Sequence, residues 1–234
     1  FLTAKTILGP QTIFRYNMYQ AARISGAQAP GHSSGEAMAA MERVAKASLP
    51  DGYKYEWTDM SFQERQAAGK AGIVFAVALL FIYFFLVGQY ESWMIPIAIM
   101  LSVPVALLGS LLFLYFLGIE NNIYTQIGFV ILFGITCKTE ILIVEFAKNM
   151  RDKGMGIVES AIEARKIRFR AVVMTGMAFI LGVFPLVIAI GAGAASRRSL
   201  GTAIFGGMLV GEVVGTIMTP MFYVAVQWLR EKVG

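Results

Sequence analysis

Five long apolar stretches dominate the sequence after residue 70 and restrict what the chain can fold into. They cover about residues 71–88, 94–117, 123–147, 171–190 and 200–228. Each has about the length that a helix needs to cross a bilayer, which is roughly 20 residues. Because a chain in lipid must satisfy its own backbone hydrogen bonds, we expect a mainly α membrane protein with a bundle of five transmembrane helices.

The composition supports a membrane protein. Of the 234 residues, 57% are hydrophobic and 15% are charged, and the mean hydropathy is +0.64. A soluble domain carries about 25% charged residues. The sequence begins with Phe1 instead of Met and shows no signal-peptide pattern, so we expect a fragment or a processed product.

Residues 1–69 are more polar and form a separate region in this interpretation. Loose alternation predicts one or two strands within residues 15–30 and a second strand at residues 53–60. Between them, residues 33–48 read as a helix, because Ser33 is followed three residues later by glutamate, the spacing of a capping box. We therefore expect a small α+β (β-α-β) unit ahead of the transmembrane region, residues 70–234.

The placement of lysine and arginine predicts the orientation in the membrane, since these residues are more frequent on the cytoplasmic side. They are dense in the connection over residues 148–170 and also occur in the C-terminal tail. We expect both segments to be cytoplasmic and residues 1–69 to lie on the opposite side. Residues 156–167 read as a short amphipathic helix along the cytoplasmic surface. This bias accounts for the net charge of +5, so no nucleic-acid partner is expected.

Lys138 lies inside the third apolar stretch. A charge at the centre of a bilayer costs about 2.5–3.5 kcal/mol on insertion scales, so such residues usually face a protein interior and pair with an opposite charge. Glu140 points to another face of a helix, and Glu145 is about 10 Å further along its axis. We therefore expect a carboxylate partner on a helix that this chain does not contain. The alternative is a lysine that extends to the interface.

The last apolar stretch contains Glu212 beside a row of small residues. Gly207, Gly211 and Gly215 recur at every fourth position, a spacing that lets helices pack closely. Glu212 is either a group that takes up and releases protons or a carboxylate paired within the bundle, and the sequence leaves both possibilities open.

Signals for enzymes, metals and cofactors are weak. Cys137 and His32 are the single cysteine and the single histidine, so we expect no disulfide within the chain and no metal site. We find no glycine loop for nucleotides, no paired metal ligands and no nucleophile–base set, so an enzyme is not expected.

Several stretches together resemble the resistance–nodulation–division efflux transporters, in particular the exporters of hydrophobic and amphiphilic compounds in Gram-negative inner membranes. They are "GAQAPGHSSGEAMAAMERVA", "YEWTDMSFQERQ", "GQYESWMIPIAIMLSVP", "KTEILIVEFAKNM", "RFRAVVMTGMAFILGVFPLVIAIGAGA" and "GTAIFGGM". The resemblance covers almost the whole chain. It implies that the chain is roughly the C-terminal quarter of such a transporter, that residues 1–69 end its periplasmic porter region and that the five helices are the last of twelve.

The resemblance also implies site residues. It matches Lys138 to a membrane lysine that pairs with two aspartates of the N-terminal half, whose protonation releases the lysine, and it places Arg168 and Thr175 on the proton route. Glu140 and Glu212 stand where the family commonly has small residues. They either add carboxylates to this proton relay or mark a different subfamily.

A further set matches a region near the periplasmic mouth where lipophilic drugs are thought to enter, namely Trp57, Met60 and Glu64. The alternative for Trp57 is an interfacial aromatic residue, and for Met60 it is packing.

The function expected from the resemblance is proton-driven export, with no cofactor besides the proton gradient. The expected partners are the missing N-terminal part of the same transporter, two further copies in a homotrimer, a periplasmic adaptor, an outer-membrane channel and the lipid bilayer. Two other readings remain: a protein-export subunit of the same superfamily, and a truncated membrane protein that does not transport and serves as a scaffold or binds a partner.

Overall fold

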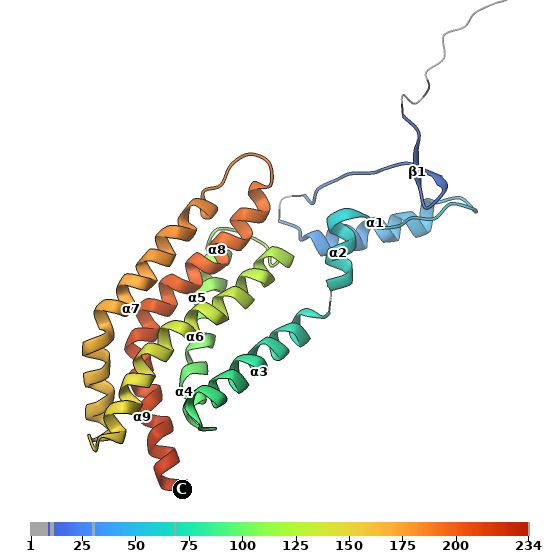
Figure 1. Ribbon diagram of the computed structural model, residues 1–234. Coiled ribbons are helices and arrows are strands. Elements are labelled where there is room, and N and C mark those ends of the chain that lie inside the picture. Colours follow the sequence, from blue (N-terminus) through green and yellow to red (C-terminus); the bar gives the residue numbers. More distant parts are fainter. Residues whose placement is uncertain (1–8, 10–11, 30, 68, 234) are drawn as a thin grey trace, which may run out of the picture. The chain divides into compact units, whose positions relative to one another are not determined.

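The computed structural model describes residues 9, 12–29, 31–67 and 69–233. The chain divides into two compact units, Phe1–Glu56 and Trp57–Gly234. Figure 1 labels β1 and the helices α1 to α9.

The described residues of the first unit form a two-stranded sheet and one helix. β1 (Phe14–Tyr16) pairs antiparallel with β2 (Tyr19–Ala21). The two residues between them have positive φ, as a tight hairpin turn requires. α1 (Ser34–Ser48) begins at the predicted capping box, in which the Ser33 hydroxyl accepts from the Glu36 N–H and the Glu36 carboxylate accepts from the Ser33 N–H.

The strand predicted at residues 53–60 is wrong. Residues 53–58 have no regular secondary structure, and a short helix, α2 (Asp59–Ala67), begins immediately after them. Tyr53 and Tyr55 remain 70% and 39% exposed, and within the described residues no strand pairs with this segment. Within the described residues the order of elements ahead of the membrane helices is therefore β-β-α-α.

The second unit is mainly helical, which agrees with the predicted fold class. Five segments are long and apolar enough to cross a membrane: Ala71–Tyr90, Ile95–Phe116, Ile123–Asp152, Ile157–Val187 and Ala194–Lys232. Their helices are α3 (Ala71–Tyr90), α4 (Ile95–Met100), α5 (Ser102–Phe116), α6 (Ile123–Asp152), α7 (Ile157–Val187), α8 (Ala194–Val210), the π-helix η1 (Gly211–Gly215) and α9 (Thr216–Val233). Figure 1 shows α5 to α8 running side by side.

The glycines of α8 and η1 lie at close helix contacts. A Cβ atom on Gly207 would stand 2.2 Å from the Leu132 side chain of α6, and one on Gly211 would stand 3.2 Å from Ala106 of α5. Real Cβ atoms essentially never come as close as the first distance. A side chain at Gly207 would therefore displace the Leu132 side chain from the contact between α6 and α8.

The helix predicted at residues 156–167 is present from Ile157, but it is not a short helix of its own. α6 continues to Asp152 and α7 starts at Ile157, so the connection consists of residues 153–156, with Gly154 at a φ of 96°. α7 then runs unbroken to Val187, with Pro185 in its last turn, and its N-terminal part buries a face of small residues. Ser160, Ala161 and Ala164 are all buried on this face.

Candidate functional site

Lys138 projects from the middle of α6 and is exposed on the surface of the bundle. Its Nζ atom lies 5.4 Å from the centroid of the Phe179 ring on α7. Within the part of the chain that the structure describes, Lys138 forms no ion pair, and neither Glu140 nor Glu145 contacts its amine. The five helices thus present an unpaired cation at a depth where ions are costly.

Glu140, unlike the exposed Lys138, is buried inside the bundle. Its side chain is 3% exposed and lies between α6 and α9. The Thr219 hydroxyl contacts the Oε2 atom of Glu140 in hydrogen-bond geometry. The other carboxyl oxygen, Oε1, stands 2.9 Å from where a Cβ on Gly215 would be, so the absence of a side chain at Gly215 makes room for the carboxyl group.

The Thr219 hydroxyl has a second oxygen neighbour besides Glu140. The Thr219 hydroxyl also lies 2.7 Å from the Gly215 carbonyl oxygen, the usual partner of a threonine four residues further along a helix. A hydroxyl has one hydrogen but can accept as well as donate. The single hydroxyl hydrogen of Thr219 therefore lies between two acceptors, the Glu140 carboxyl oxygen and the Gly215 carbonyl oxygen.

Glu212 lies in η1 and reaches between α6 and α7. The Thr139 hydroxyl of α6 donates to its Oε1 atom at 3.1 Å. Its Oε2 atom is buried and has no hydrogen-bond partner. The carboxyl group lies over Gly176 of α7, where a Cβ would be 2.4 Å from the Glu212 Cδ atom. Gly176 and Thr139 therefore shape the space that holds this carboxyl group.

The π-helix η1 places both carboxyl sites. It spans Gly211–Gly215 between α8 and α9, and the Thr216 hydroxyl donates to the Glu212 carbonyl oxygen at 2.5 Å. Single π turns inside α-helices are rare in proteins. Those that do occur are often found at functional sites. Here the turn contains both Glu212 and Gly215, and the Gly215 carbonyl oxygen contacts Thr219.

The remaining predicted relay residues lie on α7. The Arg168 guanidinium stacks 3.6 Å from the centroid of the Phe146 ring, and its buried Nε atom has no hydrogen-bond partner. The Thr175 hydroxyl lies 2.9 Å from the carbonyl oxygens of both Ala171 and Val172, so it is occupied by its own helix. Among the described residues, neither side chain hydrogen-bonds to the two glutamates.

The residues predicted for substrate entry lie at and beside α2. Trp57 and Glu64 are partly buried, while Met60 is 40% exposed. The Met60 sulfur accepts a hydrogen bond from the Tyr124 hydroxyl of α6 at 3.3 Å. This contact fixes Met60 against the start of α6.

Sequence reasoning did not identify Thr139, Thr219 or Gly176. A usable signal existed for Thr219, because it follows Glu212 by seven residues and so falls close to the same helical face. No group of three or more histidine, cysteine, aspartate or glutamate residues that could hold a metal ion occurs among the residues described.

The fold and these buried polar groups define a polytopic membrane protein with ionisable side chains inside its helical bundle. The sequence matches the model of the AcrB/AcrD/AcrF family over residues 1–227, and the chain belongs to this family. It is 42% identical over 229 residues to the toluene efflux pump membrane transporter TtgB of Pseudomonas putida, which covers 98% of this chain and 22% of that protein.

Two further relatives come from Escherichia coli strain K12. The multidrug export protein AcrF is 39% identical over 228 residues, or 97% of this chain and 22% of its own length. The multidrug resistance protein MdtF is 40% identical over 222 residues, or 94% of this chain and 21% of its own length. The chain thus spans about a fifth of the length of the curated relatives it matches.

Proposed function

We propose that this chain forms part of a proton-driven membrane transporter that exports hydrophobic or amphiphilic compounds, with Lys138 as a charge in its transmembrane proton relay. The observation that carries the proposal is the exposed, unpaired amine of Lys138 on an otherwise apolar helix surface. The names of the relatives, a toluene efflux pump and multidrug exporters, support this class of cargo.

The relay works through a change of charge opposite Lys138. Carboxylates on helices outside this chain pair with the amine while they are ionised. When they take up protons, the attraction to Lys138 is lost, and in a low-dielectric environment this changes the local energy strongly. The freed lysine then changes its position, and this movement is coupled to the porter region.

Arg168 and Thr175 lie on the proton's path along α7 in this proposal. Thr175 is deeper in the apolar part of the helix, and Arg168 is seven residues closer to its charged end. A hydroxyl followed by a cation gives a polar route through this end of the helix.

Glu140 adds a group that can bind protons on the side of α6 away from Lys138, and Glu212 adds a second one between α6 and α7. Residues two positions apart on a helix face nearly opposite directions, so Glu140 and Lys138 act in different surroundings.

The proposed setting is the inner membrane of a Gram-negative cell. Residues 1–69 are periplasmic and the C-terminus is cytoplasmic. Trp57, Met60 and Glu64 then lie near the periplasmic mouth, where they contact entering substrates. The partners are the rest of the transporter, two further copies in a homotrimer, a periplasmic adaptor and an outer-membrane channel.

The test is proton-driven transport by the native protein that contains this chain, reconstituted in liposomes with an imposed pH gradient. Lys138→Ala should lower the rate about tenfold or more, because it removes a charge that acts only during the cycle. The matched control is Lys148→Ala on the same helix, whose amine donates to the Tyr90 carbonyl oxygen at 3.0 Å. It should retain most of the rate.

The same assay separates the alternatives. Transport by Lys138→Ala at the wild-type rate, with the pH gradient still required, would remove Lys138 from the relay. A wild-type protein that moves no hydrophobic compound under any gradient would favour a scaffold that does not transport. Intact mass spectrometry of the native protein, run in parallel, establishes which chain length was assayed.

A further inference from the structure

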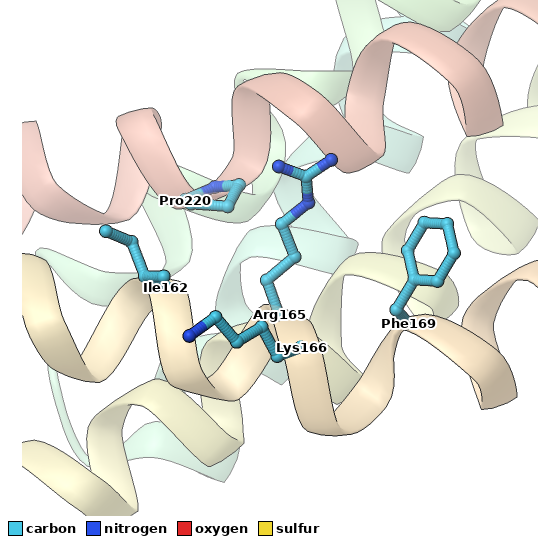
Figure 2. A pocket seen from close by; sticks show the side chains of 5 residues that line it. All are labelled: Ile162, Arg165, Lys166, Phe169 and Pro220. Carbon is cyan, nitrogen blue, oxygen red and sulfur yellow. The ribbon is translucent and has the colours of Figure 1, made fainter.

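A cleft of about 460 Å³ opens between α7 and α9. Figure 2 shows the Arg165 side chain extending from α7 toward the ribbon of α9 that carries Pro220. The lining combines two cationic side chains with three apolar ones. The cations are Arg165 and Lys166, and the apolar residues are Ile162, Phe169 and Pro220. Such a mixture suits a ligand with an anionic head and an apolar body.

Arg165 supplies an unused anion-binding group. Its side chain is partly buried, and within the described residues it makes no hydrogen bond or ion pair. A guanidinium has five N–H donors in a fixed plane and binds phosphate oxygens through two parallel hydrogen bonds. A partly buried, unpartnered arginine beside a cleft therefore points to an anionic ligand.

Lys166 provides a second cation that can be recruited. Its amine lies 3.3 Å from the Glu163 carboxylate, and the two side chains are 67% and 42% exposed. Exposed ion pairs of this kind are weak. A phosphate held by Arg165 can compete with Glu163 for the Lys166 amine.

The position of the cleft along α7 matches the headgroup layer of a membrane. α7 has 31 residues, so at 1.5 Å per residue it is about 46 Å long, which exceeds the roughly 30 Å hydrocarbon core. Arg165 precedes the start of the apolar stretch at Ala171 by six residues, or about 9 Å. Phe169 lies between these two levels and is 49% exposed.

We propose that this cleft binds an anionic phospholipid of the leaflet on the lysine- and arginine-rich side of the membrane. Arg165 and Lys166 hold the phosphodiester, and Phe169 and Pro220 contact the upper part of an acyl chain. Basic pockets between transmembrane helices on the cytoplasmic side are suited to anionic headgroups. The apolar lining distinguishes this ligand from a free phosphate ion. The proposal does not depend on the proposed transport activity.

The experiment measures lipid binding to the native protein, purified in a mild detergent, by native mass spectrometry. The probes are phosphatidylglycerol and phosphatidylcholine with identical acyl chains. We expect the wild type to prefer phosphatidylglycerol, and Arg165→Gln/Lys166→Gln to bind it about tenfold more weakly, the scale of one lost charge-assisted contact. Binding of phosphatidylcholine should not change.

A matched control removes two other cations from the same charged end of the bundle. Lys153→Gln/Lys232→Gln loses the same net charge, but neither residue lines the cleft. It should bind phosphatidylglycerol within about twofold of the wild type, whereas a general effect of net charge would weaken both double variants alike.

A second variant guards against misfolding. Ile162→Glu places a carboxylate at a cleft position that is 48% exposed, so it should fold and still repel the phosphate. The proposal is overturned if the Arg165/Lys166 variant binds phosphatidylglycerol as the wild type does, if the control variant loses as much, or if phosphatidylcholine binds equally well. Displacement of the lipid by millimolar inorganic phosphate would also overturn it, in favour of a soluble anion.

Discussion

Glu140 of α6 and Thr219 of α9 are in hydrogen-bonding contact across the helix interface, and their side chains are 3% and 0% exposed. The contact joins residues that are 79 positions apart in the sequence. A carboxyl group in this position needs both a partner and space, which Thr219 and Gly215 provide. The interface between α6 and α9 therefore accommodates the Glu140 carboxyl group with both a hydrogen-bonding partner and sufficient space.

The first prediction concerns Glu140→Gln. The amide has nearly the shape of a protonated carboxyl group and can still donate to Thr219, so stability should stay within about 1 kcal/mol of the wild type. If Glu140 binds and releases a proton during transport, the variant should nevertheless lose transport about tenfold or more. The measurements are thermal unfolding in detergent and transport driven by a pH gradient.

Thr219→Val is the companion variant, because it keeps the shape of the side chain and removes the hydroxyl. It leaves the Glu140 carboxyl group without its partner and should cost about 1–3 kcal/mol of stability. Full transport by Glu140→Gln would show that the residue stays neutral throughout the cycle and has a structural role alone.

The second prediction concerns the space that Gly176 leaves for Glu212. In Gly176→Ala the new Cβ would stand 2.4 Å from the Glu212 Cδ atom, so the carboxyl group must move away from Thr139. Overpacking of this kind should destabilise the protein by about 1–3 kcal/mol. Thermal unfolding is again the measurement.

Two controls test the cause of this loss. Gly182→Ala lies on the same helix, but nothing stands within 4 Å of its new Cβ, so it should be neutral or slightly stabilising. The double variant Gly176→Ala/Glu212→Ala should regain part of the stability, because the clash is gone. Additive losses in the double variant would contradict direct contact between the two sites.

The membrane helices could be predicted from the sequence because each one is specified locally. The stretch predicted at residues 71–88 forms the helix Ala71–Tyr90, and that predicted at residues 123–147 forms the start of Ile123–Asp152. Their ends were predicted too short, since a helix continues past the hydrocarbon core for as long as its residues favour helix. Hydropathy indicates which part of a helix lies in the hydrocarbon core, but it does not indicate the residue at which the helix ends.

The partners of the buried carboxyl groups could not be predicted in the same way. The contacts of Glu140 with Thr219 and of Glu212 with Thr139 join residues more than 70 positions apart, and they depend on how α6, α7 and α9 pack. The π-helix has no clear sequence signal either. The wrong strand at residues 53–60 has the opposite cause, because its local pattern suggested a strand but none of the strands that the structure describes pairs with it.

The third prediction concerns the pH dependence of α1. A side-chain hydrogen bond from His32 and then a backbone hydrogen bond from the Ser33 N–H lower the pKa of Glu36 from its ordinary value of 4.5. Because the folded pKa is depressed, this stabilisation is present above pH 4.5 and is lost as the pH falls through the folded pKa. An NMR titration of the Glu36 carboxyl carbon measures the shift directly.

His32→Ala should raise the pKa of Glu36 toward 4.5, because the larger cause of the shift is removed. Lys46→Ala, at the other end of α1, is the control and should leave that pKa where it is. An unchanged Glu36 titration in His32→Ala would mean that the Ser33 N–H alone sets the pKa.

The fourth prediction concerns the ion pair that joins the ends of α6 and α9. The Arg151 Nε and Nη2 atoms donate to the two carboxylate oxygens of Glu231, each at 2.8 Å, and Nη1 donates to the Met155 carbonyl oxygen at 2.6 Å. Two parallel hydrogen bonds fix the geometry better than a single contact does. Arg151→Gln and Glu231→Gln should therefore each lower the unfolding temperature.

The double variant should lose less than the sum of the two single losses, and this coupling should shrink at high salt, because the pair is partly exposed. The exposed pair of Lys166 and Glu163, three residues apart on α7, is the reference and should show a smaller coupling. Equal coupling for the two pairs would mean that the doubly bonded geometry of Arg151 adds no stability. A coupling that does not respond to salt would instead assign the effect to helix packing.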